Sequence, residues 1–193
     1  NTAEERGGAI YVGNGSDHCT ILNCYFQGNN VSKANNATGG AIDFRSKLVY
    51  IINSNFTNNN AYEGGAVYLG GDQGFANVTN SIFIENHATL HGGAIDVNTS
   101  SVHLNNSRFI SNIAQAGGAL NVQGEGMTSQ VFNSEFIANN ATNGTGGAIN
   151  WVASPGQIFD SNFTYNEAIN GGGVYFGGVS SNSSISGVIF DGN

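Results

Sequence analysis

The chain has 193 residues, a formal net charge of −8 and only 9% charged residues, while glycine alone fills 29 positions. Its five lysines and arginines are scattered, whereas binding to a nucleic-acid backbone needs clustered cations. No apolar run approaches the roughly 20 residues that span a bilayer. The sequence therefore predicts neither a nucleic-acid partner nor a transmembrane segment, and its 39% of hydrophobic residues argues against disorder.

A Gly-Gly-Ala-aliphatic motif dominates the sequence, and each copy is followed after 19 or 17 residues, in alternation, by Phe-x-x-Asn. The glycine pairs begin at Gly7, Gly39, Gly64, Gly92, Gly117, Gly146 and Gly171. The phenylalanines are Phe26, Phe56, Phe83, Phe109, Phe136, Phe163 and Phe190. A repeat of about 27 residues predicts a solenoid of seven coils, forming a single domain over residues 1–193.

The residues after each glycine pair predict a first strand, because apolar positions alternate with polar or amphipathic ones. Its inward positions begin at Ile10 and Val12. The column between them is expected to face outward as a solvated strand face. It contains Tyr11, Asp43, Tyr68, Asp96, Asn121, Asn150 and Tyr175.

Two further strands follow in each coil. One carries an aliphatic residue five positions before the phenylalanine, as Ile21 precedes Phe26. This odd spacing means that one straight strand cannot bury both residues, so the chain must bend between them. The bend is expected at a residue that tolerates left-handed backbone. The bend residues are Asn23, Asn53, Asn80, Asn106, Asn133, Asp160 and Gly187.

The asparagine of each Phe-x-x-Asn marks a second corner, where its amide is expected to bond to the coils above and below. These residues are Asn29, Asn59, Asn86, Asn112, Asn139, Asn166 and Asn193. The glycine pair forms the third corner, and the stretch between asparagine and glycine reads as a loop. Three short strands and three corners per coil predict an all-β fold, a single-stranded parallel β-helix.

The repeated Gly-Gly-Ala-[Ile/Leu/Val] and Phe-x-x-Asn pair resembles the polymorphic outer membrane protein repeat, which also occurs in adhesin-like surface proteins of bacteria and methanogenic archaea. The resemblance covers all seven coils and departs in the last at Gly173, Gly187 and Val188. It implies a right-handed β-helix of pectate-lyase type, exported to the cell surface and used in adhesion. Fold and function separate readily, so the adhesive role remains an expectation.

Enzymatic chemistry has few candidate residues. Asp43 and Asp96 on the first strand are two coils apart, and paired carboxylates are what a glycosidase uses. Only Arg45 and Lys47 provide basic groups nearby. A solvated strand face is the simpler interpretation, so we expect no enzymatic activity, no catalytic residue and no cofactor.

Metal ligands and a disulfide are not predicted either. His87 and His91 are expected in a loop, without the fixed geometry that zinc requires. Acidic residues in loops, Asp17, Asp72 and Glu125, match no calcium motif. The two cysteines are expected to be free, buried thiols. They are Cys19 and Cys24.

Surface modification and contact have clearer candidates. Asn-x-Ser/Thr sequons, the acceptors of N-linked glycans, occur at Asn14, Asn30, Asn36, Asn55, Asn77, Asn98, Asn105, Asn140, Asn143, Asn162 and Asn182. We expect Asn55 and Asn162 to point outward on a strand. Outward Tyr11, Tyr68 and Tyr175 suit contact with a sugar or a protein, and Asp43 and Asp96 share their column.

The sequence thus predicts an extracellular, secreted, glycosylated structural or adhesive module of a cell surface. The alternative is a polysaccharide-binding or polysaccharide-degrading β-helix protein. Expected partners are adjacent repeats or copies of the chain stacked head to tail, a cell-surface glycan or a host protein. If residue 1 of a second copy followed Asn193, Gly7 would stand ten positions after Phe190, which keeps the repeat in register.

Overall fold

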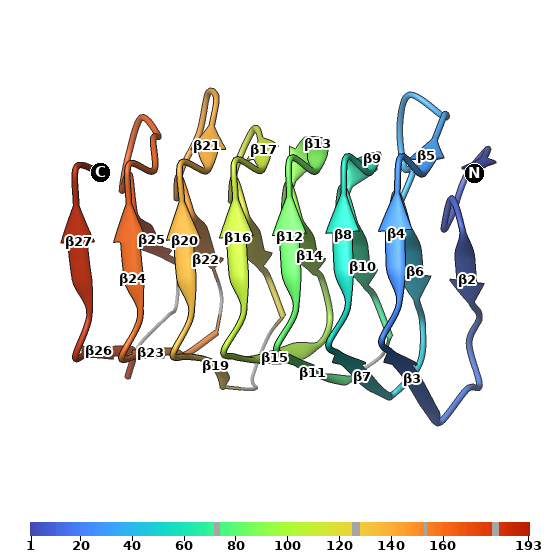
Figure 1. The fold of residues 1–193 in the computed structure, drawn as a ribbon, viewed down its shortest axis with the longest axis horizontal. Helices are drawn as coiled ribbons and strands as arrows, with labels where there is room; N and C mark the ends of the chain where they lie inside the picture. Colours follow the sequence, from blue (N-terminus) through green and yellow to red (C-terminus); the bar gives the residue numbers. More distant parts are fainter. Residues whose placement is uncertain (72–73, 125–127, 153, 179–181) are drawn as a thin grey trace.

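A parallel β-solenoid of about seven coils makes up the protein (Figure 1). The structure is a computed structural model that describes residues 1–71, 74–124, 128–152, 154–178 and 182–193. Strands from successive coils pair in parallel and form four sheets along the solenoid. The fold class predicted from the repeat is therefore confirmed.

The first sheet follows the glycine pairs and contains β2 (Ile10–Val12), β6 (Ile42–Phe44), β10 (Val67–Leu69), β14 (Ile95–Val97), β18 (Leu120–Val122), β22 (Ile149–Val152) and β25 (Val174–Gly177). The second sheet contains β3 (His18–Leu22), β7 (Leu48–Ile52), β11 (Phe75–Thr79), β15 (Ser101–Asn105), β19 (Ser129–Phe132), β23 (Gly156–Phe159) and β26 (Ser184–Ser186).

The third sheet carries the phenylalanines and contains β4 (Tyr25–Gln27), β8 (Asn55–Thr57), β12 (Ile82–Ile84), β16 (Arg108–Ile110), β20 (Glu135–Ile137), β24 (Asn162–Thr164) and β27 (Ile189–Asp191). The fourth sheet lies between the ladder asparagines and the glycine pairs and contains β1 (Thr2–Ala3), β5 (Asn30–Val31), β9 (Asn60–Glu63), β13 (His87–His91), β17 (Ile113–Ala114) and β21 (Asn140–Ala141).

The fourth sheet corrects the prediction of three strands per coil. Most of its strands are short and bury a single residue, such as Ala61 or Ala114, so the alternation is too brief to reveal a strand in the sequence. The predicted loop is thus a strand, and His87 and His91 lie in β13.

The core is a set of columns of identical or similar side chains. Neighbouring phenylalanine rings of the third sheet stack nearly parallel, with centroids 4.8 Å apart between Phe83 and Phe109 and an interplanar angle of 2°. Phe109 is fully buried, as is Leu104 in the inward aliphatic column of the second sheet. At the C-terminal coil, Phe190 is 47% exposed because it stacks on only one described neighbour, Phe163.

The predicted asparagine ladder is present and runs along the whole solenoid. Each ladder asparagine accepts two hydrogen bonds at its amide oxygen from the preceding ladder asparagine. For Asn112 Oδ1, the donors are the backbone nitrogen and Nδ2 of Asn86, both at 3.0 Å. Asn112 Nδ2 in turn donates to the Phe83 carbonyl at 3.0 Å. These bonds satisfy polar groups that are fully buried at this corner.

A second ladder, which the sequence pattern did not predict, is formed from Cys24 to Ser161 by the small residue two positions before the phenylalanine of each coil. Ser107 Oγ donates to the Asn105 carbonyl at 3.0 Å and accepts a hydrogen bond from the Ser81 nitrogen at 3.2 Å. Cys24 has the same position and its Sγ donates to Leu22 O. The serine ladder therefore closes the bend between the second and third sheets.

The corners follow the predicted left-handed residues with one correction. The bend asparagines adopt positive φ, as Asn106 does at 49°, but at the second corner the left-handed residue precedes the ladder asparagine. Ser111 (φ 53°) is one example. At the third corner, Gly92 has φ 62°, and a Cβ on Gly93 would lie 2.0 Å from Gly118 O of the next coil. Coil stacking therefore requires glycine there.

The phenylalanine stack is open to a direct stability test. Replacing Phe109 with Ala should lower the free energy of unfolding by about 3–5 kcal/mol, because it leaves a cavity in a fully buried column. Phe132→Ala is the matched control, since Phe132 also stacks on a phenylalanine (Phe159, centroids 5.0 Å apart) but is only partly buried. Equal losses for the two variants in denaturant titrations would contradict the assignment of the core.

Candidate functional site

The column of the first sheet that was expected to face solvent is largely buried. Asp43, Tyr68 and Asp96 are 0%, 5% and 1% exposed, respectively. Tyr11 is 48% exposed and Tyr175 is partly buried. Asn121 and Asn150 are also buried, so the prediction of an outward surface is wrong for the five residues of this column that lie between Tyr11 and Tyr175. We call the buried set the polar strip. It consists of Asp43, Tyr68, Asp96, Asn121 and Asn150.

The polar strip is buried because the residues just before each glycine pair fold across it. Their backbones are bridged from coil to coil, Thr38 to Glu63 and His91 to Glu63. Thr38 Oγ1 donates to Asp43 Oδ2, five residues later. Thr145 Oγ1 donates to Asn150 Oδ1 in the same way at 2.7 Å. The unrecognised fourth sheet is thus the reason that the exposure was mispredicted.

One end of the strip is a buried ion pair. Arg45 donates from Nε to Asp43 Oδ1 at 2.7 Å and from a terminal nitrogen to Oδ2 at 3.0 Å. The Arg45 guanidinium also lies 4.5 Å from the centre of the Tyr68 ring, as a cation–π contact. A Cβ on Gly70 would be 2.3 Å from Tyr68 Cε1, which explains the glycine two residues after this tyrosine. Burial and the neighbouring Asp96 raise the pKa of Tyr68 to about 12.

The other end of the strip is a chain of amides that terminates on a carboxyl group. Asn150 Nδ2 donates to Asn121 Oδ1 at 2.7 Å, and Asn121 Nδ2 donates to Asp96 Oδ1 at 2.6 Å. Burial raises the pKa of Asp96 to about 7, against the opposing effects of the Asn121 hydrogen bond and His91, with Glu63 adding to the rise. Protonated Asp96 thus resembles an asparagine side chain, because it is uncharged and accepts the hydrogen bond of Asn121 in the same way.

Carboxyl groups with a pKa near neutrality are often catalytic acids. Here the two carboxyl groups are hydrogen-bonded within the strip, and neither is exposed beyond 1%. Tyr68 separates Asp43 from Asp96 in the sheet register. These hydrogen bonds have a structural role, because they satisfy the polar groups that are buried between the first and fourth sheets.

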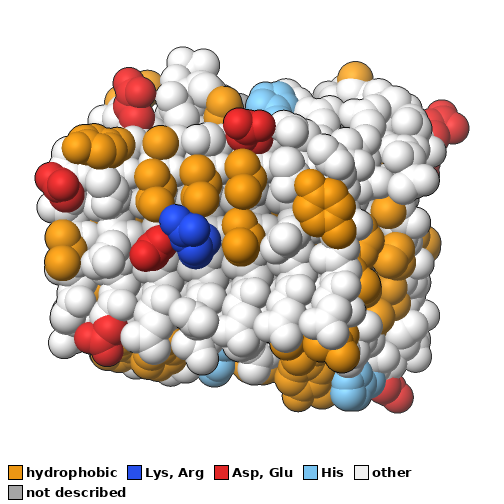
Figure 2. Space-filling view, viewed as in Figure 1, with side chains coloured by type: hydrophobic (Ala, Val, Ile, Leu, Met, Phe, Trp, Pro, Cys, Tyr) orange, Lys and Arg blue, Asp and Glu red, His pale blue; other side chains and the backbone are white. Residues whose placement is uncertain are grey.

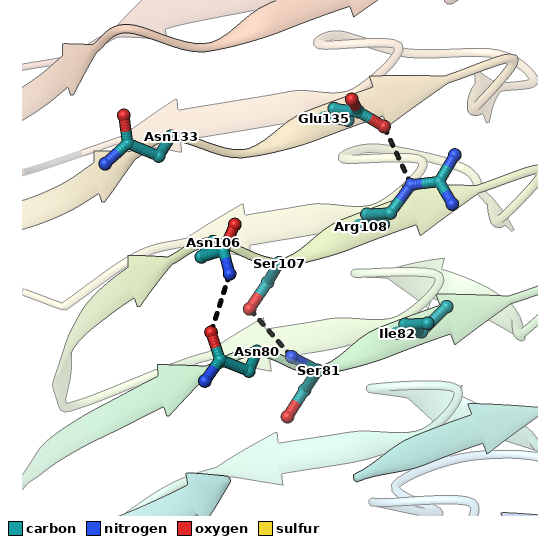
Figure 3. Close-up of a pocket in the computed structure, with 8 residues that line it drawn as sticks. All are labelled: Asn80, Ser81, Ile82, Asn106, Ser107, Arg108, Asn133 and Glu135. Carbon is teal, nitrogen blue, oxygen red and sulfur yellow. Dashed lines mark hydrogen bonds and ion pairs between the residues drawn. The ribbon is translucent and has the colours of Figure 1, made fainter. Parts of the chain in front are cut away.

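The outer face of the third sheet carries a shallow depression that sequence reasoning missed. Its volume is about 240 Å³, and its lining includes Asn80, Asn106, Arg108 and Glu135 (Figure 3). Arg108 Nε donates to Glu135 Oε2 at 2.7 Å, and Asn106 Nδ2 donates to Asn80 Oδ1 at 2.7 Å. Figure 2 shows, in the same view as Figure 1, a basic side chain beside an acidic one with hydrophobic side chains around them. The partly buried isoleucines of these strands are Ile82, Ile84, Ile110 and Ile137.

The outer face of the second sheet combines aromatic rings with amides. The centroids of His18 and Tyr50 are 5.3 Å apart, and Gln130 Nε2 donates to Gln157 Oε1 at 2.7 Å. None of the seven strands of this sheet contains Asp, Glu, Lys or Arg. In a chain of net charge −8, these strands contribute no formal charge apart from any protonated histidine, although the exposed Lys47–Asp17 ion pair directly precedes β7 and β3.

All eleven sequon asparagines are at least partly exposed. The exposed ones are Asn14, Asn36, Asn55, Asn105, Asn143, Asn162 and Asn182, and the partly buried ones are Asn30, Asn77, Asn98 and Asn140. Asn55 and Asn162 point outward from the third sheet as predicted. Asn30 and Asn140 lie in strands of the fourth sheet rather than in loops, because that sheet was not recognised.

The remaining candidate ligands are dispersed. Among the described residues, no group of three or more His, Cys, Asp or Glu side chains could hold a metal ion. Asp72 and Glu125 lie outside the described residues. Cys19 and Cys24 are free as predicted, but both are partly exposed rather than buried. Within the described ranges there is also no helix of the length and apolarity that a membrane crossing requires.

Comparison with known proteins gives one partial match. Over 120 residues, 62% of its length, the chain is 35% identical to metabotropic glutamate receptor-like protein R of Dictyostelium discoideum. The chain spans only 7% of that protein. No family profile matches the chain, and no solved structure matches it significantly.

The raised pKa of Asp96 predicts a pH-dependent stability. Because the folded-state pKa (about 7) is above the ordinary value of 3.8, the stabilising contribution of the proton is complete below about pH 4 and is lost as pH rises through 7. Asp96→Asn should therefore increase the free energy of unfolding at about pH 8, on the order of a few kcal/mol, and flatten its dependence on pH.

The control for this experiment is Asp43→Asn, which breaks the Arg45 ion pair and leaves a partly buried guanidinium without its carboxylate. This variant should be destabilised. Thermal unfolding across the pH range would measure both variants. An Asp96→Asn protein that is less stable than the parent at pH 8 would show that Asp96 is not a proton-bearing member of the amide chain.

Proposed function

We propose that this chain is a rigid structural module of an extracellular or cell-surface protein, with adhesive contacts made by its outer faces and no enzymatic activity. The observation that carries this proposal is that columns of side chains connect successive coils along the solenoid. Asparagine, serine and phenylalanine columns link each coil to the next, as at Asn112, Ser107 and Phe109. Such nearest-neighbour coupling suits a stiff spacer.

The resemblance to the polymorphic outer membrane protein repeat supports this proposal. Those proteins are exported and used in adhesion, and this chain repeats the same motif pair with a glycine corner and an asparagine ladder. On this basis we propose that the chain belongs to that family, winds to the right and is located at the cell surface.

The partial match to a receptor-like protein is compatible with the same location. That relative is named a metabotropic glutamate receptor-like protein, and the matched segment is a small part of it. We propose that the β-solenoid forms part of the extracellular region in such a context. We infer no ligand for this chain from its similarity to that relative.

Two outer faces are the proposed contact surfaces, in place of the buried Tyr68, Asp43 and Asp96. The strands of the second sheet contain no Asp, Glu, Lys or Arg, which favours a neutral partner, a glycan or an uncharged protein surface. Its aromatic rings pack against one another, as Phe132 does with Phe159 at 5.0 Å, so a protein partner fits better than sugar rings that need a free aromatic face. A polysaccharide-binding protein remains the second candidate.

Stacking of further coils is also part of the proposal. Asn1 Nδ2 donates to Asn29 Oδ1 at 2.8 Å, and Asn166 Nδ2 donates to Asn193 Oδ1 at 2.7 Å, so Asn1 and Asn193 occupy equivalent ladder positions. Further coils of the same polypeptide, or of a second copy, can therefore continue the ladder.

The proposed location and contact can be tested together on the source cells. An antibody against the folded chain should label intact cells, and beads coated with the chain should adhere to those cells. Phe132→Ser with Phe159→Ser should reduce bead adhesion, whereas Ile113→Ser on the fourth sheet, which is 39% exposed and outside both proposed contact faces, serves as the matched surface control. Labelling only after permeabilisation would contradict the surface location.

Two further readouts separate the alternatives. The intact mass of native material should fall on removal of N-linked glycans if exposed sequons such as Asn55 and Asn162 are occupied. Incubation with a panel of polysaccharides should release no reducing ends. Release that Asp43→Asn or Asp96→Asn abolishes, in a variant that remains folded, would establish the enzymatic alternative.

A further inference from the structure

Three Asn-Gly sequences occur in the chain, and the structure holds them very differently. They are Asn14–Gly15, Asn143–Gly144 and Asn170–Gly171. An asparagine followed by glycine is prone to lose its side-chain amide, because glycine has no side chain to hinder the attack of its backbone nitrogen and its backbone rotates freely. Whether the glycine nitrogen can approach the asparagine Cγ depends on how freely the local backbone can rotate.

We propose that Asn14 is a site of spontaneous modification, at which its side-chain amide is lost through a cyclic imide formed with Gly15. The Gly15 nitrogen attacks Asn14 Cγ, and a new N–C bond closes the five-membered ring. The bond from Cγ to the amide nitrogen breaks, and that nitrogen leaves as ammonia with the proton given up by Gly15. Water then opens either carbonyl of the imide and leaves aspartate or isoaspartate, without any oxidation or reduction.

The loop around Asn14 permits this reaction. Val12 O accepts a hydrogen bond from Arg45 N at 2.8 Å, and Ser16 O accepts one from Lys47 N at 3.2 Å, so the loop is fixed on both sides of residues 13–15. Asn14 and Gly15 are exposed. Gly15 has φ 93°, and a Cβ added to it would meet no atom within 4 Å. The peptide between Asn14 and Gly15 therefore has room to rotate towards the side chain.

Asn143 is exposed as well, but its glycine is held between coils. Gly144 O accepts hydrogen bonds from Ile169 N at 3.1 Å and Asn170 N at 3.4 Å. A Cβ on Gly144 would lie only 2.4 Å from Gln115 O. Rotation of the peptide before Gly144 therefore requires the neighbouring coils to separate locally.

Asn170 is held through its own backbone. Its nitrogen donates to Gly144 O, and its carbonyl accepts from Gly146 N at 3.0 Å. Gly171 O accepts from Gly147 N at 3.0 Å. Since both flanking peptides take part in coil pairing, imide formation at Asn170 also needs local opening, and its rate falls with the population of the open state.

The modification changes the charge of a loop that already contains an ion pair. Asp17, three residues after Asn14, pairs with Lys47, whose Nζ lies 3.2 Å from Asp17 Oδ1. An aspartate at position 14 adds a second carboxylate nearby, and an isoaspartate lengthens the loop backbone by one methylene. Asn14-Gly15-Ser16 is also a sequon, so a glycan would occupy the same amide nitrogen. This competition, unlike the imide chemistry, rests on the proposed extracellular location.

Peptide mapping by mass spectrometry tests the proposal on unglycosylated chain kept folded at mildly alkaline pH. The gain in mass from replacing NH₂ by OH should appear at Asn14 about tenfold faster than at Asn143 or Asn170, which are controls within the same molecule. Asn14→Gln should remove the fast event and leave the other two rates unchanged. An amide at Asn14 that lasts as long as those at Asn143 and Asn170 would overturn the proposal.

An unfolded sample identifies the cause of the difference. In denaturant, the three sites should react at similar rates, because each is then a free Asn-Gly sequence. If Asn14 remains about tenfold faster in the unfolded chain, local sequence rather than loop geometry sets the order, and the structural argument fails. Chain from a glycosylating host should show protection at Asn14, and Ser16→Ala should remove it. Failure of this last arm alone would count against the proposed location and leave the imide chemistry intact.

Discussion

The hydrogen bond from one ladder asparagine to the next is the interaction on which the solenoid depends. At each coil it satisfies a backbone nitrogen and a side-chain amide within a fully buried corner, as Asn86 does with Asn112. A buried amide without these partners would cost about 1–3 kcal/mol. Because the acceptor always belongs to the following coil, the corner is stable only when coils stack in register, and the register in turn aligns the phenylalanine rings.

The second consequence of this register is that polar residues can be buried beside the apolar core. The serine ladder closes one bend, and the polar strip fills the space between the first and fourth sheets. Within the strip, Asn150, Asn121 and Asp96 form one amide chain that ends on a carboxyl group. The chemistry of these residues thus supports the fold, and the surfaces left for partners are the outer faces of the second and third sheets.

Much of the fold was predictable because the same residue types recur at each coil. Phe109, Leu104 and Asn112 each belong to a column whose burial follows from repetition alone. The fourth sheet was not predictable in the same way, since β17 has only two residues and one inward alanine. Missing that sheet also caused the error at Asp96, whose cover comes from His91 and its neighbours. The alternation in the first strand correctly separates two faces but cannot reveal that a further strand lies across the outer one.

The surface was harder to predict than the core for a physical reason. The ion pair between Arg108 and Glu135 joins residues of successive coils, and only the coil register brings them to 2.7 Å. The aromatic contact between Phe75 and His103 depends on the same register. Inward columns are conspicuous because packing demands similar side chains, whereas outward columns vary freely and carry no comparable periodic signal.

Hydrogen exchange of side-chain amides, followed by NMR, tests the central role of the asparagine ladder most directly. The amide protons of Asn59, Asn86, Asn112 and Asn139 should exchange only when the solenoid opens, because each is buried and hydrogen-bonded to the next coil. Those of the exposed Asn55 should exchange freely. Ladder amides that exchange as fast as Asn55 would show that these hydrogen bonds do not hold the coils together.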